Sequence, residues 1–347
     1  LNKSDVGLVS TNSPLVIGAI LPLSGDFGAL GEEVNKGALI AINEAKAEFP
    51  DITFISEDDQ FSAKSMVAAA QKLISTDGIS AAFTMAVQEA KPIAPVFNKA
   101  KIPLLVSWDS NEFIKTGGDS LYSIGFSTEG AGEKMAEYAY AKLGIKKVAL
   151  IYHIDEWANL ITGAFRAKFK ALGGVVVLDE QTIVGTKDYR TLIARAKVAG
   201  ADAIYFPMVP SANSIFASQA RELKFTGVFL NGDGFIQSEI DAAGLAAEGI
   251  YFTNVYGERL SVLAEKYKQK YGVDSGDIIF ASFGYDAVNT LIAAYRIARQ
   301  SDISITKALK RVDIEGIGAR IMMNGMRYSE RQEKMYKVVN GVPVLAE

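Results

Sequence analysis

The sequence predicts an α/β fold in which two doubly wound parallel-sheet lobes follow one another along the chain. Short apolar runs alternate with longer amphipathic stretches, which is the order of βαβ units. This alternation ends near residue 124 and starts again near residue 147. A length of 347 residues also favours two domains over one.

The first series opens with the apolar run from Leu15 to Leu21, which is typical of a strand buried on both faces. A loop containing Gly25, Gly28 and Gly31 follows, at the carboxyl end of that strand, where open α/β sheets bind their ligands. Helical spacing of apolar residues then predicts helices at 31–47, 62–76 and 88–99, between strands at 52–56, 79–83, 102–106 and 121–124.

The second series begins with a buried strand at 147–152 and a helix that ends at Gly173-Gly174. Further strands are predicted at 175–178, 203–206, 228–230 and 249–252. Three helices without a sheet of their own follow, at 259–271, 279–298 and 304–312, and then two weak strands at 319–322 and 335–339. The polar residues 1–14 lack periodicity, so we expect a leader or spacer there.

Composition excludes several classes of function. The net charge is −4 and no basic stripe is evident, which argues against nucleic acid as a partner. The chain has no Cys and one His, so thiolate chemistry, His-based triads and metal sites are poorly supported, and no metal or cofactor is expected. No apolar run of about 18 residues and no signal-peptide pattern is present.

Two groups of residues, the glycine loop with the acidic run 57–59 and the cluster around His153, each allow an enzymatic and a structural interpretation. The three glycines with Glu57-Asp58-Asp59 suggest a dinucleotide site, but the G-x-x-G-x-x-G spacing and Pro22 favour glycines that serve a wide loop and close packing. His153 with Asp155 and Glu156 suggests an acid–base cluster, yet no nucleophile motif accompanies it, so a structural or surface His is favoured. The acidic run 57–59 is expected to be a solvated strand end rather than a hard-cation site.

The two tryptophans provide a stronger signal. Trp108 and Trp157 both fall at or just after the carboxyl end of a predicted strand, one in each series, and Asp109 and Asp233 have the same placement. Packing in the core would explain each Trp singly. Four such residues at strand ends of two lobes predict a hinged binding protein that closes on a ligand.

These features resemble the type I periplasmic binding proteins of branched-chain amino acid (Leu/Ile/Val) ABC importers. The resemblance runs from about residue 15 to 340 in one order, and it is carried by Val16-Ile17-Gly18-Ala19-Ile20-Leu21-Pro22-Leu23-Ser24-Gly25, Gly37-Ala38, Lys187-Asp188-Tyr189, Gly200-Ala201-Asp202-Ala203-Ile204, Glu248-Gly249-Ile250 and Tyr285-Asp286-Ala287. It implies two lobes joined by a three-crossover hinge, with 15–127 plus 256–326 in lobe 1 and 128–255 plus 327–347 in lobe 2.

The resemblance also implies a set of ligand-binding residues. The loops after the third and fourth strands, which hold the ligand carboxylate in the family, are here Thr84-Met85-Ala86-Val87-Gln88 and Ser107-Trp108-Asp109-Ser110-Asn111. Trp157 matches the aromatic residue that closes from the second lobe, and Asp233 matches the acid that binds the ligand amine. The complete expected set is Phe27, Leu30, Met85, Ala86, Trp108, Asp109, Ser110, Trp157, Met208, Val209, Asp233 and Phe280.

The expected function is that of a non-enzymatic, periplasmic or extracellular, optionally lipid-anchored, solute-binding protein. It would act as a monomer, capture a small polar solute such as an amino acid, an aromatic compound or a cation, and deliver it to an ABC permease. The loop at 84–88 lacks the Ser hydroxyl that the family uses to bind the ligand carboxylate, and the loop at 107–111 contains Asp109. Both differences make these loops unfavourable to an anion. The alternatives are a ligand-sensing domain of a receptor or regulator and, with less support, an NAD-dependent dehydrogenase.

Overall fold

The computed structural model describes residues 14–256, 259–329, 331 and 333–346, and the contacts divide the chain into two compact units. The first unit comprises residues up to 127 together with 256–331, and the second comprises 128–255 together with residues from 332 onward. The sequence placed the last boundary at 326/327. Arg331 explains the difference, because it is buried in the first unit and donates to the carbonyl oxygen of Ile124 and to Asp286.

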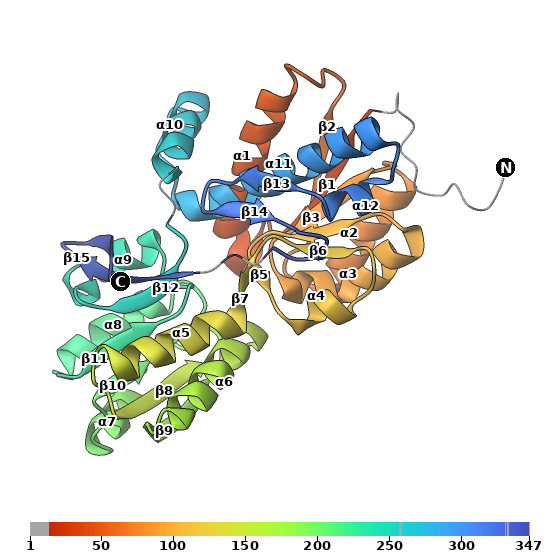
Figure 1. The fold of residues 1–347 in the computed structure, drawn as a ribbon. Helices are drawn as coiled ribbons and strands as arrows, with labels where there is room; N and C mark the ends of the chain where they lie inside the picture. The colour runs from red at the N-terminus through yellow and green to blue at the C-terminus, as the bar shows by residue number, and fades with distance from the viewer. Residues whose placement is uncertain (1–13, 257–258, 330, 332, 347) are drawn as a thin grey trace. The chain divides into compact units, whose positions relative to one another are not determined.

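The sheet of the first unit has five parallel strands in the order β2-β1-β3-β4-β6 (Figure 1). Its strands are β1 (Val16–Leu21), β2 (Thr53–Asp58), β3 (Ala81–Thr84), β4 (Leu104–Val106) and β6 (Leu121–Ser123). The crossover helices are α1 (Gly28–Ala45), α2 (Ala63–Ser75) and α3 (Val87–Ala100). Shorter elements are the 3₁₀ turn Gly25–Phe27, β5 (Asp109–Ser110), α4 (Glu112–Thr116) and β7 (Phe126–Ser127).

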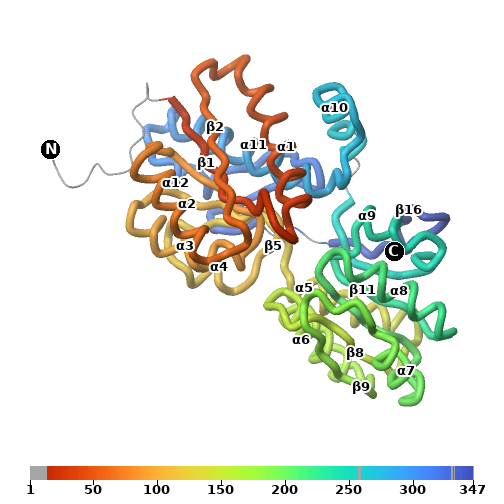
Figure 2. Tube along the Cα trace, turned by 180° about the vertical axis from the view of Figure 1, so that it is seen from behind, coloured from red at the N-terminus to blue at the C-terminus, as the bar shows by residue number. Residues whose placement is uncertain are grey.

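The later segment of the first unit contains α10 (Leu260–Tyr271), α11 (Ile278–Ser301) and α12 (Ile305–Leu309), followed by the hairpin of β13 (Asp313–Glu315) and β14 (Arg320–Met322). Helix α10 packs against α1 and α11, and α12 packs against α11. Helices α1 and α11 lie side by side (Figures 1 and 2). Glycines permit the contact, because a Cβ at Gly37 would lie 1.8 Å from the carbonyl oxygen of Ala281. A Cβ at Gly284 would lie 1.9 Å from that of Val34.

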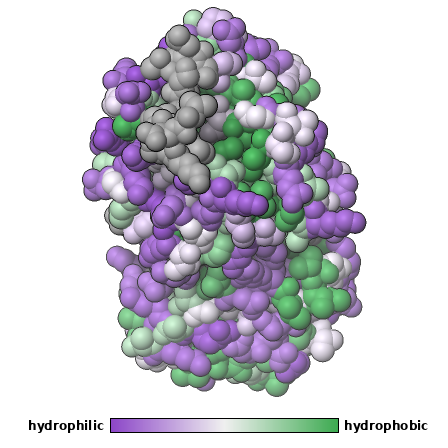
Figure 3. Space-filling view, turned by 90° about the vertical axis from the view of Figure 1, so that its right-hand side faces the viewer, coloured by the Kyte–Doolittle hydropathy of each residue, from purple (hydrophilic) through white to green (hydrophobic). Residues whose placement is uncertain are grey.

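Contrary to the expectation that no apolar run of about 18 residues is present, helix α11 is long and apolar enough to cross a membrane by length and composition, with a mean hydropathy of 1.3. However, 83% of that stretch is buried inside the unit, so it is a core helix. Some apolar side chains exposed elsewhere, such as Val198 and Leu245, stand singly, whereas Val342, Val344 and Leu345 lie together on the last strand of the chain. The face seen in Figure 3 is accordingly mostly hydrophilic, with separate apolar areas.

The sheet of the second unit has seven strands in the order β16-β15-β12-β11-β10-β8-β9. Its parallel strands are β8 (Lys147–His153), β9 (Val175–Thr182), β10 (Ala203–Tyr205), β11 (Val228–Asn231) and β12 (Tyr251–Asn254). The tail adds two antiparallel strands at one edge, β15 (Lys334–Val339) and β16 (Val342–Leu345). The helices are α5 (Thr128–Ala141), α6 (Glu156–Ala171), α7 (Arg190–Val198), α8 (Asn213–Glu222) and α9 (Gln237–Ala243), and a 3₁₀ turn follows at Gly244–Ala247.

The predicted fold class is therefore confirmed for both units. Each unit has its own apolar core, formed by side chains of its sheet and its helices. In the first unit this core joins Leu73, Phe97 and Leu104, and in the second it joins Leu150, Phe165 and Tyr205.

Candidate ligand-binding faces

The strand order marks one crevice in each unit. In the first unit β1 lies between β2 and β3, so the connections that leave β1 and β3 run to opposite faces of the sheet. In the second unit β8 lies between β9 and β10 in the same way. Open α/β sheets bind ligands outside the carboxyl ends of strands at such switch points. The candidate face of each unit is therefore the set of loops that follow these strands.

In the first unit, backbone bonds bring two of the predicted loops together. The amide of Trp108 donates to the carbonyl oxygen of Met85 over 2.9 Å, which joins the loop after β4 to the loop after β3. The Oδ1 atom of Asp109 accepts the amide of Val87, the first residue of α3, over 2.7 Å. The buried Asp109 carboxylate thus occupies a helix N-terminus, where negative charge is favoured.

Two further acids lie behind Asp109. Glu89 is fully buried and its Oε2 atom accepts the amide of Ala86 over 2.5 Å. Burial and then the charge of Asp59 hold the pKa of Glu89 well above its usual range. Burial also raises the pKa of Asp59, which accepts the amide of Phe61 over 2.7 Å. The prediction of a solvated acidic strand end is wrong for Asp59, because its side chain is completely covered.

Aromatic side chains complete this face. Trp108 is half-buried and packs edge-on against the buried Phe280, with ring centroids 5.1 Å apart, and it stacks on Phe283 at 6.3 Å. Phe27 is half-buried and lies 4.3 Å from the ring of Phe61. The structure therefore links Trp108 with Met85 and Phe280, and it places Asp109 on Val87, the residue after Ala86. The remaining predicted residues of this unit, Leu30 and Ser110, are buried.

In the second unit, a direct hydrogen bond joins the two predicted residues at the strand ends. Asp155 caps α6 by accepting the amide of Trp157 over 2.9 Å. The indole Nε1 of Trp157 then donates to Oδ1 of Asp233 over 3.0 Å. The loop at Asp233 lies against the indole ring, since a Cβ at Gly234 would be 3.0 Å from it. Trp157 stays half-buried, while Asp233 is only 7% exposed.

Buried amides hold the Asp233 loop in place. Asn231 accepts the amide of Gly232 over 2.7 Å and donates to the carbonyl oxygen of Phe206 over 3.0 Å. Asn254 donates to the carbonyl oxygen of Asp233 over 3.2 Å. Because the network ties three strand ends together, the indole and the carboxylate are fixed by the fold before any ligand arrives.

A buried acid lies behind Asp233, as Glu89 does behind Asp109. Burial and then the charge of Asp233 raise the pKa of Glu333 well above its usual range. Burial and the same two acids raise the pKa of Tyr205 well above its usual range, and the Tyr205 hydroxyl has no hydrogen-bond partner within the described chain. No local pattern around Glu333 indicated a role for it, because it lies 100 positions from Asp233.

The remaining predicted residues of this unit lie close by. Met208 is fully buried, and Val209 is the half-buried member of the pair. The amide of Val209 donates to Nδ1 of His153 over 3.2 Å, and Nε2 of His153 lies 3.2 Å from the Tyr189 hydroxyl. Burial lowers the pKa of His153 to about 4, so it is a neutral, structural residue at pH 7.

The structure gives the glycine loop a packing role. A Cβ at Gly31 would lie 2.0 Å from the carbonyl oxygen of Pro22, so the start of α1 is held against the loop. Asp58 accepts the amide of Leu23 over 2.9 Å and the hydroxyl of Ser24 over 2.5 Å, and so braces that loop. Within the described residues, no group of three or more acidic, His or Cys side chains could hold a metal ion.

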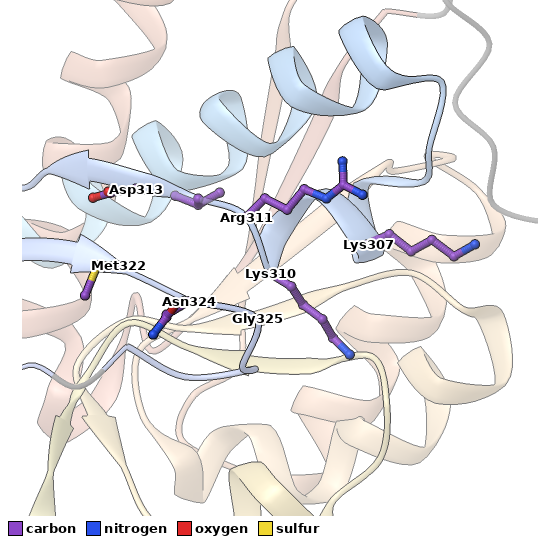
Figure 4. A pocket seen from close by; sticks show the side chains of 8 residues that line it. Lys307, Lys310, Arg311, Asp313, Met322, Asn324 and Gly325 are labelled. Atoms are coloured by element: carbon purple, nitrogen blue, oxygen red, sulfur yellow. The ribbon is translucent and has the colours of Figure 1, made fainter.

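A surface pocket of about 560 Å³ in the first unit lies away from these loops, between α12 and the β13–β14 hairpin. It is basic, with Lys307, Lys310 and Arg311 in its lining (Figure 4). The three side chains point in different directions, so their charges do not converge on one point. The pocket therefore has no built anion site.

Comparison with known proteins agrees with this architecture. The family model described as periplasmic binding protein matches residues 14–336. A Leu/Ile/Val-binding protein homologue from Brucella melitensis is 27% identical over 249 residues, which cover 69% of this chain and 67% of the relative.

Two solved structures are similar over nearly the whole chain. A leucine-binding protein from Thermotoga maritima has a TM-score of 0.83 and 26% identity, covering 96% of this chain and 98% of its own. A branched-chain amino acid transporter substrate-binding protein from Streptococcus pneumoniae, solved with isoleucine, has a TM-score of 0.84 and 23% identity, covering 95% and 98%. The chain belongs to the periplasmic binding protein family, in the type I group that includes the Leu/Ile/Val-binding proteins of ABC transporters.

Proposed function

We propose that this protein is the extracytoplasmic solute-binding component of an ABC importer, and that it captures one small polar solute with residues of both units. Hinge closure would bring the two candidate faces onto the solute, and the loaded protein would deliver it to a membrane permease. The proposal includes no catalytic step, no cofactor and no nucleic acid, and it assumes that the protein acts as a monomer.

The observation that carries the proposal is the Trp157–Asp233 pair at the switch point of the second unit. A half-buried indole hydrogen-bonded to a carboxylate offers an apolar surface and a charge side by side. The buried amides that fix the pair limit the entropy lost on binding. Ligand pockets of this kind combine aromatic walls with a few fixed polar groups.

A thermal-shift screen with amino acids, amines and aromatic acids, followed by calorimetry, tests the proposal. We expect one class of solute to stabilise the protein, and we expect Trp157→Ala and Asp233→Ala to weaken its binding at least tenfold. Leu245→Ala is the matched control, because Leu245 is 96% exposed in the same unit. Unchanged affinity in both site variants would overturn the assignment of these residues.

Two other functions remain to be separated from this one. A dehydrogenase predicts measurable heat on titration with NAD or NADP, whereas we expect none because the glycine loop is packed against Pro22. A sensor domain predicts the same solute binding but a different partner. Co-purification with a permease, rather than with a receptor or regulator, would distinguish the importer.

A further inference from the structure

The loops of both candidate faces are acidic. In the first unit, the loops at 22–27, 59–62, 85–86, 107–108 and 124–125 contain the exposed Asp26 and the covered Asp59 but no Lys, Arg or His, and Asp109 follows directly. Arg331 donates to the carbonyl oxygen of Ile124, and its charge is paired with Asp286. In the second unit, the loops at 154–155, 206–212 and 232–236 contain Asp155 and Asp233 and again no basic residue. The loop after the edge strand β9 does contain a basic residue, Lys187.

Two of the amides at the start of α3 in the first unit are already bound by carboxylates of the protein. The amide of Val87 is bound by the Asp109 carboxylate, and the amide of Ala86 is bound by Glu89. A ligand carboxylate at this helix N-terminus would have to displace Asp109 or lie beside it. Two carboxylates within a few ångströms repel each other unless one takes up a proton. The negative charge at the start of α3 is therefore provided by the protein's own Asp109.

An aromatic ring is bonded to the carboxylate in the second unit, and in the first unit an aromatic residue directly precedes the carboxylate in the chain. Asp233 accepts the indole N–H of Trp157, so the ring is held next to the negative charge. Trp108 directly precedes Asp109 and is held by Phe280 and Phe283. Both indoles are half-buried. An indole face next to a carboxylate suits a cation, which gains from the ring quadrupole and from the opposite charge together.

We propose that the solute is an organic cation, such as an amine or a guanidinium compound, that carries no carboxylate. This inference rests on the proposed function and names the class of solute that the same two faces would take. Asp109 and Asp233 provide the opposite charges, and Trp108 and Trp157 provide the rings. Asp109 is then the residue that determines specificity against amino acids, because it fills the amide position that a ligand carboxylate would need.

Matched pairs of compounds test the inference by calorimetry at pH 7. Each pair is an amine and the amino acid that gives it on decarboxylation: isopentylamine and leucine, 2-phenylethylamine and phenylalanine, agmatine and arginine. Benzoate serves as an anion without an amine. We expect the amine of a pair to bind at least tenfold more tightly than its amino acid. Equal or tighter binding of the amino acids or of benzoate would overturn the inference and leave the proposed function standing. Binding by none of the seven compounds at 10 mM would count against both.

Two variants test the role of Asp109 separately. Asp109→Asn keeps an acceptor for the Val87 amide and removes the charge, so we expect about tenfold weaker amine binding with the melting temperature maintained. Asp109→Ala frees that amide, and we expect the amino acid of the pair to gain affinity. Asp51→Asn, at an exposed position of the same unit, is the control. Amine affinity unchanged in Asp109→Asn, or no gain for the amino acid in a folded Asp109→Ala, would contradict the inference.

Discussion

Replacing Gly37 with Ala should destabilise the first unit, because the contact between α1 and α11 leaves no room for a methyl group. The new Cβ would lie 1.8 Å from the carbonyl oxygen of Ala281 and 2.6 Å from its carbon. Since Cβ contacts under 3.0 Å are essentially never seen, the two helices would have to separate by roughly 1.2 Å. The neighbouring contact between Gly284 and Val34 would open with them.

The size of the effect follows from two opposing contributions. Overpacking a core costs about 1–3 kcal/mol, and the upper part of that range applies here because the atoms in the way belong to a backbone that cannot change rotamer. Ala in place of Gly in a helix returns about 1 kcal/mol. We therefore expect a net loss of about 2 kcal/mol, which corresponds to a fall in melting temperature of about 4–8 °C for a domain of this size.

Calorimetric melting and urea unfolding measure this change, with Gly163→Ala as the matched control. Gly163 lies within α6, and no atom comes within 4 Å of the position of an added Cβ. There the same substitution should stabilise the protein by about 0.5–1 kcal/mol. A Gly37→Ala variant that is as stable as the unmodified protein would refute the steric argument.

Three further predictions concern buried charges. Arg331→Met should cost about 3–5 kcal/mol in urea unfolding, because Asp286 is left as an unpaired buried charge. The double variant Asp286→Asn/Arg331→Met should recover part of the loss, and no recovery would show that the pair is not coupled. His153 has a folded-state pKa lowered to about 4, so stability present above pH 6.5 should be lost as the pH falls toward 4. His153→Gln should make the free energy of unfolding depend less on pH between about 6.5 and 4. An unchanged pH dependence in this range would contradict the argument. The raised pKa of Glu89 has the opposite sign, so its contribution is greatest at low pH and is lost as the pH rises through that pKa. Glu89→Gln should therefore gain stability relative to the unmodified protein above neutral pH and not near pH 4, and a difference independent of pH would exclude this explanation.

The sequence predicted the parallel strands and their helices well, because each is a local pattern. The buried run at β1 and the helical spacing of α1 are both visible within about twenty residues. The tail strand β15 was a weak signal, because its pairing partner β12 lies about 80 residues earlier. The two-residue strands β5 and β7 were missed, since they are too short to show an alternation of polar and apolar residues.

The candidate faces were predictable in part, because the positions of residues at strand ends are also a local pattern. Strand-end placement indicated that Trp157 and Asp233 lie at the same edge of a sheet, and the structure joins them directly. Their role in binding a solute stays a proposal. Placement could not show that Asp109 is bound to the Val87 amide, or that Asp59 is completely buried. Those facts depend on how loops from different strands meet, which no single stretch of sequence encodes.

The way in which the first unit is assembled has a consequence for the time course of synthesis. Helix α1 buries one face against α11, although α11 begins 250 residues after α1 begins. At about 5–20 residues per second, a ribosome would finish α11 some tens of seconds after it has made α1. The parallel strands β8 to β12 and their helices lie in one continuous segment, so most of the core of the second unit can form during this interval, and Met335 of β15 joins it later. The face of α1 that packs against α11 therefore has no partner until α11 has been made.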